Sequence, residues 1–307
     1  MRAFVFPGQG SQFVGMGREA YIDNNIVRDI FDRANDVLGY ELTGIMFEGP
    51  DEELRQTENA QPAIFVHSYA LFQLLGSPQP AMAAGHSLGE YTALTVANAL
   101  AFDEALRLVQ IRAGAMREAG RQAQGTMAAV IGLDDETIGR ICRQVYEEVG
   151  VVQSANFNSP GQVVVSGTPD AVAETMRRAK EAGARMVKQL NVSGAFHSPL
   201  MEPARQKLAE ALSDAPIRDA DFPVYVNVSG EPVTAAGAIR ESLLKQLTAP
   251  VQWTKTIERM AADGASEFIE VGPGNVLQGL VKRIAPDTTQ RGVADLAMVA
   301  AFNEPGT

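Results

Sequence analysis

Cysteine, long apolar runs and positive charge are all scarce in this chain of 307 residues. A single cysteine, Cys142, excludes a disulfide framework and a cysteine-rich metal cage. No stretch approaches the roughly 18 uninterrupted apolar residues of a membrane span, so we expect a cytoplasmic protein that does not associate with membranes. With 26 basic and 37 acidic residues, bulk electrostatics argue against nucleic acid as a partner.

Apolar residues make up 46% of the chain and charged residues 21%, which excludes a disordered or fibrous protein. The length suggests one large domain or two unequal ones. Gly8-Gln-Gly10 resembles the start of a dinucleotide fingerprint, but Phe13 stands where the third glycine is needed. No metal motif is present either, so we expect neither a cofactor nor a metal.

Short apolar strands alternate with helical patterns along most of the chain. Strands are predicted at 2–6, 81–86 and 267–271, the first and last running into glycine-rich loops. Helices are predicted at 24–38, 62–75, 88–97, 103–119, 239–247 and 254–264, with another after Gly274. This alternation predicts an α/β fold with a parallel sheet.

The pattern changes in the middle of the chain, where it has the order of a ferredoxin-like split unit. Strand, helix, strand, strand, helix and strand are predicted at 127–133, 135–148, 151–156, 162–166, 170–182 and 185–190. We therefore expect a small ferredoxin-like α+β domain over residues 126–196, inserted into a discontinuous large α/β domain of residues 1–125 and 197–307. Residues after Pro286 are expected to form a loosely attached tail.

Gly85-His-Ser-Leu-Gly89 matches the G-x-S-x-G nucleophile elbow and follows a predicted strand at the start of a predicted helix. The turn is tight, so residues flanking the serine must lack bulk, and the following helix offers N–H groups to a developing oxyanion. Ser87 is therefore the candidate nucleophile. The alternative is a glycine-rich turn whose serine only caps the helix.

A serine hydroxyl needs a base, and the chain has three histidines. His67 lies within an apolar helical pattern and is expected to be a hydrogen-bonded core residue. His86 adjoins Ser87, so its side chain should point away on a sharp turn. His197 follows the inserted unit in a loop, where catalytic groups are commonly displayed, and is the candidate base.

An elbow of this kind usually comes with an acid between serine and histidine, and no segment predicts one here. Asp134, Asp135 and Asp170 fall at predicted turns or helix caps of the inserted unit. A backbone carbonyl or an amide side chain must then orient His197, which would leave the imidazole less basic.

Seven separated motifs occur together in one order. They are Gly8-Gln-Gly-Ser-Gln12, Gly85-His-Ser-Leu-Gly-Glu-Tyr91, Gln110-Ile-Arg112, Asn156-Phe-Asn-Ser-Pro-Gly161, Gly194-Ala-Phe-His-Ser198, Gln246-Leu-Thr-Ala-Pro-Val-Gln-Trp253 and Glu270-Val-Gly-Pro-Gly274. Over about residues 1 to 285 the chain resembles the malonyl-CoA:acyl carrier protein transacylases, acyltransferases of fatty acid synthesis. The resemblance implies an α/β-hydrolase-like domain interrupted by a small ferredoxin-like one, in agreement with the predicted element order.

The resemblance also implies a role for each catalytic residue. Ser87 would carry the malonyl group as an ester, and His197 would remove its proton and later return one to a leaving group. The carbonyl of Gln246 would orient the histidine in place of an aspartate. Backbone N–H groups of Gln9 and Leu88 would form the oxyanion hole.

Selectivity for malonyl would come from two further residues. Arg112 would bind the free carboxylate, although an arginine in such a helix is more often a solvated surface residue. Phe196 fits the malonyl-selective pattern, because a large ring leaves no room for an α-methyl group. Alternatively, Phe196 only packs the loop against the core.

The implied reaction has two half-reactions, which take malonyl from malonyl-CoA and pass it to the phosphopantetheine thiol of acyl carrier protein. The carrier is expected to be acidic, as this chain is, so docking needs a local basic surface. Candidates are Arg177, Arg178, Lys180, Arg185 and Lys188, or Lys282 and Arg283. The alternatives are a serine esterase or thioesterase, and a catalytically silent docking subunit. We expect a monomer.

Overall fold

The large sheet has the strand order β10-β9-β1-β2-β7-β8 in the computed structural model, which describes residues 1–76, 78, 80–192 and 194–304. Neighbouring strands run parallel from β10 to β7, whereas β8 pairs with β7 in the antiparallel sense. The strands are β1 (Arg2–Phe6), β2 (Met82–Gly85), β7 (Val224–Tyr225), β8 (Pro232–Val233), β9 (Glu267–Val271) and β10 (Thr289–Val293). The predicted α/β class and parallel sheet are confirmed.

Strand β1 lies at the centre of this sheet, between β2 and β9, and is buried on both faces. Its side chains alternate between two cores, with Phe4 and Phe6 in one and Ala3 and Val5 in the other. Phe6 lies opposite Gly85 of β2, so both strands end at the same level. The loops after β1 and β2 therefore meet at one edge of the sheet.

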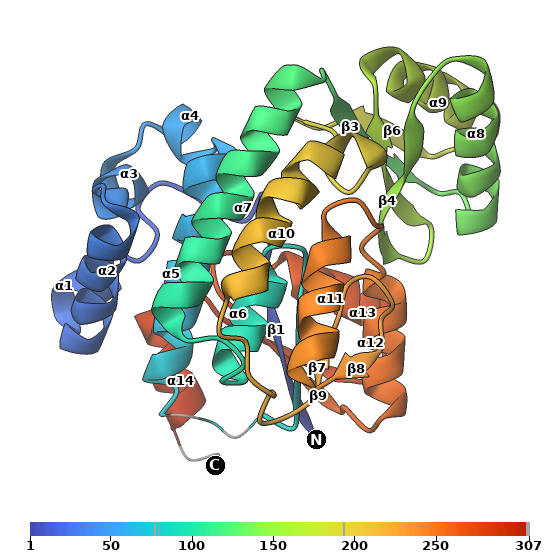
Figure 1. Ribbon diagram of the computed structural model, residues 1–307. Helices are drawn as coiled ribbons and strands as arrows, with labels where there is room; N and C mark the ends of the chain where they lie inside the picture. The colour runs from blue at the N-terminus through green and yellow to red at the C-terminus, as the bar shows by residue number, and fades with distance from the viewer. Residues whose placement is uncertain (77, 79, 193, 305–307) are drawn as a thin grey trace.

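Helices cover both faces of the large sheet (Figure 1). On the side of Phe4 and Phe6, the core includes residues of α2 (Asn25–Leu38), α3 (Leu42–Glu48), α5 (Thr57–Leu74), α6 (Gly89–Val96), α7 (Phe102–Gln122), α10 (Glu202–Asp214) and α11 (Ala236–Gln246). On the other side it includes residues of α12 (Trp253–Ala262) and α13 (Val276–Ile284). Three short elements also belong to this part: α1 (Arg18–Asp23), α4 (Asp51–Leu54) and the 3-10 helix Pro199–Met201.

Helix α5 begins at Thr57, earlier than the predicted start at Pro62. A proline inside a helix cannot donate to the carbonyl four residues before it, here that of Glu58. The Tyr40 hydroxyl donates to the Glu58 carbonyl instead, at 3.4 Å. The Glu58 carbonyl thus keeps a hydrogen-bond partner although Pro62 lies inside the helix.

Residues 126–189 form a separate antiparallel sheet with the order β4-β5-β3-β6. Its strands are β3 (Thr126–Ile131), β4 (Val152–Ser159), β5 (Gln162–Gly167) and β6 (Met186–Gln189), and its helices are α8 (Asp135–Glu148) and α9 (Pro169–Glu181). These elements have a hydrophobic core of their own. Figure 1 shows them to one side of the large sheet, and we call them the small unit.

The prediction of a loosely attached tail after Pro286 is wrong. Strand β10 extends the large sheet beside β9, and α14 (Leu296–Asn303) follows it. Val293 is buried, and the ring of Phe302 lies 6.4 Å from that of Phe4, edge to face. The polar start of β10 hid the strand, because it forms an edge and is only partly buried. Residues 305–307 lie outside the described part of the chain.

Some helices were not predicted at all, among them α3 and α10. In the part of the chain that the structure describes, no helix is both long and apolar enough to cross a membrane.

Candidate active site

The turn between β2 and α6 places Ser87 at the edge of the large sheet. Ser87 has φ 52°, in the left-handed region that most side chains avoid. A Cβ at Gly85 would lie 1.8 Å from the Gly89 carbonyl carbon, and a Cβ at Gly89 would lie 2.1 Å from the Phe6 oxygen. Neither position has room for a side chain, so both glycines of the motif are required for this turn.

His197 reaches Ser87 from the loop that follows the small unit. Its Nε2 lies 2.8 Å from Ser87 Oγ, although 110 residues separate the two in the chain. The imidazole is buried, with 3% of the residue exposed, and its backbone also has a positive φ, 56°. The structure thus brings the two residues into direct hydrogen-bonding contact.

Backbone carbonyl groups hold the other ring nitrogen of His197. Nδ1 lies 2.9 Å from the Gln246 oxygen and 3.2 Å from the Ala249 oxygen. Both oxygens can only accept, so Nδ1 carries the proton and Nε2 is left to accept one from Ser87. Burial, together with the nearby Arg112 charge, lowers the pKa of His197 to about 3, which keeps the ring neutral.

No carboxylate among the described residues contacts His197. Asp134 caps α8 instead, where it accepts from the Thr137 amide, and Asp170 lies in the first turn of α9. The orienting group is therefore a neutral carbonyl.

Arg112 extends from α7 into the same site and is fully buried. Its Nη2 donates to Ser87 Oγ at 2.9 Å and to Gln246 Oε1 at 3.0 Å, and its Nη1 donates to Gln61 Oε1 at 2.6 Å. All three acceptors are neutral. Within the described residues no carboxylate contacts this guanidinium, so its buried charge lacks a direct counter-ion. A forked donor of this kind suits a carboxylate ligand.

Two further residues support the turn, and a third holds Arg112; the sequence motifs alone did not predict the part of any of them in the site. Asn227 accepts from the Ser87 amide and donates to the Gly85 carbonyl, both at 2.6 Å. Glu90 in turn accepts a hydrogen bond from the backbone N–H of Asn227 at 2.8 Å. Gln61 is the third, and it holds Arg112 rather than the turn. The position of Glu90 directly after Gly89 was a signal for its role, whereas Asn227 lies in a segment without any motif.

The loop after β1 brings Gln9 to the same sheet edge as Leu88. Neither backbone N–H donates a hydrogen bond to any described residue, so both are free to bind an oxyanion. The Gln9 side chain is fixed, since its Nε2 donates to Thr57 Oγ1 at 3.1 Å and its Oε1 accepts from Gln61 at 3.3 Å.

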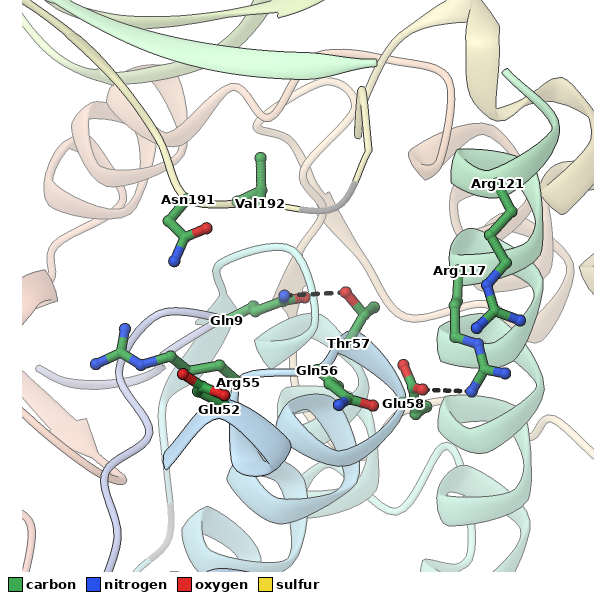
Figure 2. A pocket seen from close by; sticks show the side chains of 10 residues that line it. All are labelled: Gln9, Glu52, Arg55, Gln56, Thr57, Glu58, Arg117, Arg121, Asn191 and Val192. Carbon is green, nitrogen blue, oxygen red and sulfur yellow. Dashed lines mark hydrogen bonds and ion pairs between the residues drawn. The ribbon is translucent and has the colours of Figure 1, made fainter. Parts of the chain in front are cut away.

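Gln9 lines two cavities. One, of about 540 Å³, is lined by Gln9, Glu52, Arg55, Gln56, Thr57, Glu58, Arg117, Arg121, Asn191 and Val192 (Figure 2). Figure 2 shows the Gln9 amide turned toward Thr57 and Arg117 turned toward Glu58. The other, of about 200 Å³, lies between the loop after β1 and α13, and we call it the α13 groove.

Phe196 is buried in the main hydrophobic core, and its ring lies against Gly194. Packing of the loop therefore accounts for this residue. A role in excluding an α-methyl group stays a prediction.

Neither of the other two histidine side chains forms a hydrogen bond with Ser87 in the described part of the chain. His86 points toward the small unit, where its Nε2 lies 2.8 Å from Asn158 Oδ1. His67 is a core residue, and burial lowers its pKa to about 4. We expected a hydrogen-bonded core residue, but Nδ1 of His67 has no hydrogen-bond partner among the described residues.

A serine that donates to a neutral, buried histidine at a strand-to-helix turn is typical of enzymes that carry an acyl group on that serine. The fold and the site together place the protein in this class. Within the described residues, no group of three histidine, cysteine or acidic side chains could hold a metal ion.

Comparison with known proteins agrees. Residues 3–301 match the family described as acyl transferase domain. The chain is 46% identical to the malonyl CoA-acyl carrier protein transacylase of Bacillus subtilis over 92% of this chain and 90% of the relative. It is 45% identical to that of Escherichia coli K12, over 99% and 96%.

Solved structures give the same result. The malonyl CoA-acyl carrier protein transacylase of Coxiella burnetii superposes with a TM-score of 0.94 at 40% identity, covering 98% of this chain and 96% of the other. A malonyl-transacylase in complex with a type II PKS acyl-carrier protein gives 0.95 at 42%, covering 99% of each chain. The chain therefore belongs to the acyl transferase family and, within it, to the malonyl CoA-acyl carrier protein transacylases.

Proposed function

We propose that this protein transfers a malonyl group from malonyl-CoA to the phosphopantetheine thiol of acyl carrier protein through an ester on Ser87. The observation that carries the proposal is the double contact of Ser87 Oγ, which lies 2.8 Å from His197 Nε2 and 2.9 Å from Arg112 Nη2. One group can take the hydroxyl proton, and the other can hold the carboxylate of the acyl group.

In the first half-reaction, His197 Nε2 accepts the Ser87 proton as Oγ attacks the thioester carbonyl. The backbone N–H groups of Gln9 and Leu88 bind the oxyanion, which is worth about 3 kcal/mol for each donor. When the tetrahedral intermediate collapses, the carbon–sulfur bond breaks and His197 returns the proton to the CoA thiolate. The carrier thiol then reverses these steps. The Gln246 carbonyl keeps Nδ1 protonated throughout.

Arg112 distinguishes malonyl from acetyl. A carboxylate that leaves water for a buried site loses several kcal/mol of hydration unless a cation compensates it. The guanidinium has neutral partners only in the free site, so it can turn from Ser87 Oγ to the acyl carboxylate. Acetyl offers no such partner.

Transfer is favoured over hydrolysis by the same geometry. No carboxylate hydrogen-bonds to His197, so the imidazole is a weak base. Arg112 would also restrict rotation of the acyl group by binding its carboxylate. A thiol delivered on a long arm would be well placed, whereas water would be poorly activated. Loss of malonate from the isolated acyl-enzyme as fast as transfer would contradict this account.

The α13 groove suits the phosphopantetheine arm. Its walls combine Val276, Leu277 and Leu280 of α13 with polar groups of His86 and Asn158. Arg283, one turn beyond, donates to Gln162 Oε1 at 2.6 Å, and Gln162 also lines the groove.

We therefore place the carrier protein at Lys282 and Arg283. Among the alternatives on the small unit, Arg177 pairs with Glu174 and Glu181, and Arg178 pairs with Glu174 and Glu148. These pairs neutralise the two arginines, whereas Lys180, Arg185 and Lys188 form no ion pair among the described residues. The choice of α13 therefore rests on the position of Lys282 and Arg283 next to the α13 groove.

The sheet order and the element order of the small unit also support the finer fold assignment. We propose a ferredoxin-like domain over residues 126–196, inserted into an α/β-hydrolase-like domain of residues 1–125 and 197–307. A cytoplasmic location, a monomeric state and the lack of a cofactor stay predictions.

The direct test is intact-mass spectrometry after incubation with malonyl-CoA. We expect an increase of about 86 Da, the mass of a malonyl group replacing a hydrogen, and its loss when holo carrier protein is added. Ser87→Ala should give no adduct. An unmodified wild-type protein would refute the proposal and favour a silent docking subunit, whereas an adduct released by water alone would favour an esterase.

A further inference from the structure

Glu90 is a buried carboxyl group for which the proposed reaction has no use. Only 1% of the residue is exposed, at the first turn of α6. Its Oε2 accepts from the Asn227 amide at 2.8 Å and from Gln246 Nε2 at 3.1 Å, whereas Oε1 has no partner among the described residues. A buried carboxyl group with half of its acceptors unsatisfied is costly and calls for an explanation.

The Gln246 amide joins Glu90 to Arg112. Its Nε2 donates to Glu90, and its Oε1 accepts from Arg112 Nη2. A flipped amide would set oxygen against the carboxylate and N–H against the guanidinium, so the two charges fix its orientation together. The same amide donates to the Ser87 carbonyl at 3.0 Å. Glu90 thereby helps to hold Arg112 over Ser87 Oγ.

Glu90 also affects the net charge of the buried site. The free site holds one buried guanidinium and one buried carboxyl group, which are neutral together when Glu90 is ionised. A malonyl carboxylate adds a further negative charge, whereas an acetyl group adds none. Because the charges share a buried site, where Coulomb interactions are strong, a proton on Glu90 would restore the balance.

We propose that Glu90 is a positioning residue that neutralises Arg112 in the free enzyme and takes up a proton when the carboxylate of a dicarboxylic acyl group pairs with Arg112. This inference rests on the proposed function. Glu90 touches neither the acyl group nor Ser87 Oγ, so it acts through Gln246 and through its charge.

The surroundings of Glu90 allow this titration near neutral pH. Burial raises the pKa of Glu90 to about 7, so a proton can be gained or lost there. The charged and titratable groups that face it are Arg112 from α7 and Tyr91 on its own helix, with His197 beyond Gln246. Burial raises the pKa of Tyr91, and His197 stays neutral above about pH 3, so neither changes charge between pH 6 and 8.

The test is the ratio of malonyl to acetyl loading on Ser87 from pH 6 to pH 8, measured as single-turnover kcat/KM by intact mass. The CoA phosphates and His197 are common to both substrates, so their titrations cancel in the ratio. We expect the wild-type ratio to fall by about tenfold as Glu90 ionises, since one unit of pKa coupling is a factor of ten. Glu90→Gln should hold the ratio at its low-pH value throughout.

Glu270→Gln is the matched control. Glu270 is equally buried, but it caps α13 by accepting from the Leu277 and Gln278 amides and does not contact Arg112. This variant should keep the wild-type slope. A flat wild-type ratio, or a slope that survives in Glu90→Gln, would overturn the proposal. Equal losses of malonyl and acetyl loading with the slope unchanged would show a merely structural role.

Calorimetry covers the case in which Glu90→Gln does not fold. Ser87→Ala protein is titrated with malonyl-CoA at pH 7 in two buffers of different ionisation heat. We expect uptake of about half a proton with malonyl-CoA, and less with acetyl-CoA, because a group with a pKa near 7 is half ionised there. Equal uptake with both ligands would overturn the inference. Absence of any malonyl adduct on wild-type protein would instead refute the proposed function.

Discussion

Arg112 in the large α/β part and Arg178 in the small unit carry the same group in opposite surroundings. Arg112 is fully buried and donates to three neutral oxygens, whereas Arg178 reaches the surface and pairs with two carboxylates. An exposed arginine that is already paired with carboxylates contributes little to stability, because water screens the ion pair. A buried arginine without a contacting carboxylate has forked donors of the kind that suit a carboxylate ligand, as proposed for Arg112.

Arg112→Ala is the change that would break this comparison most decisively. Removing one partner of a buried charge pair commonly costs a factor of a hundred or more, so malonyl loading should fall by about a hundredfold. Acetyl loading should change by less than about tenfold, because acetyl has no carboxylate to lose its partner. Both rates are read from the intact-mass time course.

The matched control is Arg107→Ala on the same helix, where the side chain is exposed and lies 3.8 Å from Glu104. Both loading rates should stay near wild type in this variant. An unaltered preference for malonyl in Arg112→Ala would favour an esterase site.

A smaller effect is expected from Lys282→Glu with Arg283→Glu, which tests the unmatched cations of α13 against the matched arginines of α9. The KM for carrier protein should rise by about tenfold, because like charges then meet at the docking surface. The CoA half-reaction should be spared. Steady-state transfer to carrier protein and single-turnover loading from malonyl-CoA separate the two effects.

Neutralising Arg177 on α9 is the control for docking and should leave that KM within about twofold, since exposed matched pairs contribute little. Equal damage to both half-reactions in the α13 variant would contradict docking there. A larger KM change from the α9 variant would move the carrier protein to the small unit.

The smallest effect is expected from Arg178→Ala, which removes the matched surface arginine itself. The pKa of Glu174 is held low, at about 2, by its bonds to Arg177 and Arg178, and Arg177 remains in the variant. The melting temperature should fall by less than about 2 °C, because solvent already screens the lost pairs. Thermal denaturation followed by circular dichroism measures the melting temperature. A larger fall would mean that these surface ion pairs contribute substantially to the stability of the protein.

The parts of the fold with a regular apolar period could be predicted from the sequence. Helix α2 begins after the capping Asn24 and ends at Gly39, as its pattern of apolar residues indicates. Strand β10 could not be predicted, because it lies at the edge of the sheet and is mostly only partly buried, so its sequence lacks a run of apolar residues. The start of helix α5 was predicted too late, because Pro62 lies inside the helix, whereas a proline usually marks the first turn of one.

The candidate site divides in the same way. The two glycines around Ser87 follow from the geometry of one turn and can be read locally. The multiple role of Gln246 cannot, because its carbonyl faces His197 while its amide faces both Arg112 and Glu90. Such an arrangement depends on tertiary packing, and no spacing along the chain encodes it. Asn227 was missed for this reason.

The left-handed backbone at Ser87 and His197 has a consequence for protein engineering. Conformations of this kind cost of order 1–3 kcal/mol for each residue that bears a side chain. Both halves of the reacting pair therefore rest on backbone that glycine would adopt more readily. Glycine would relieve this backbone cost at either position, but it would also remove the side chain that the proposed reaction needs, so conformational ease and activity are in conflict there.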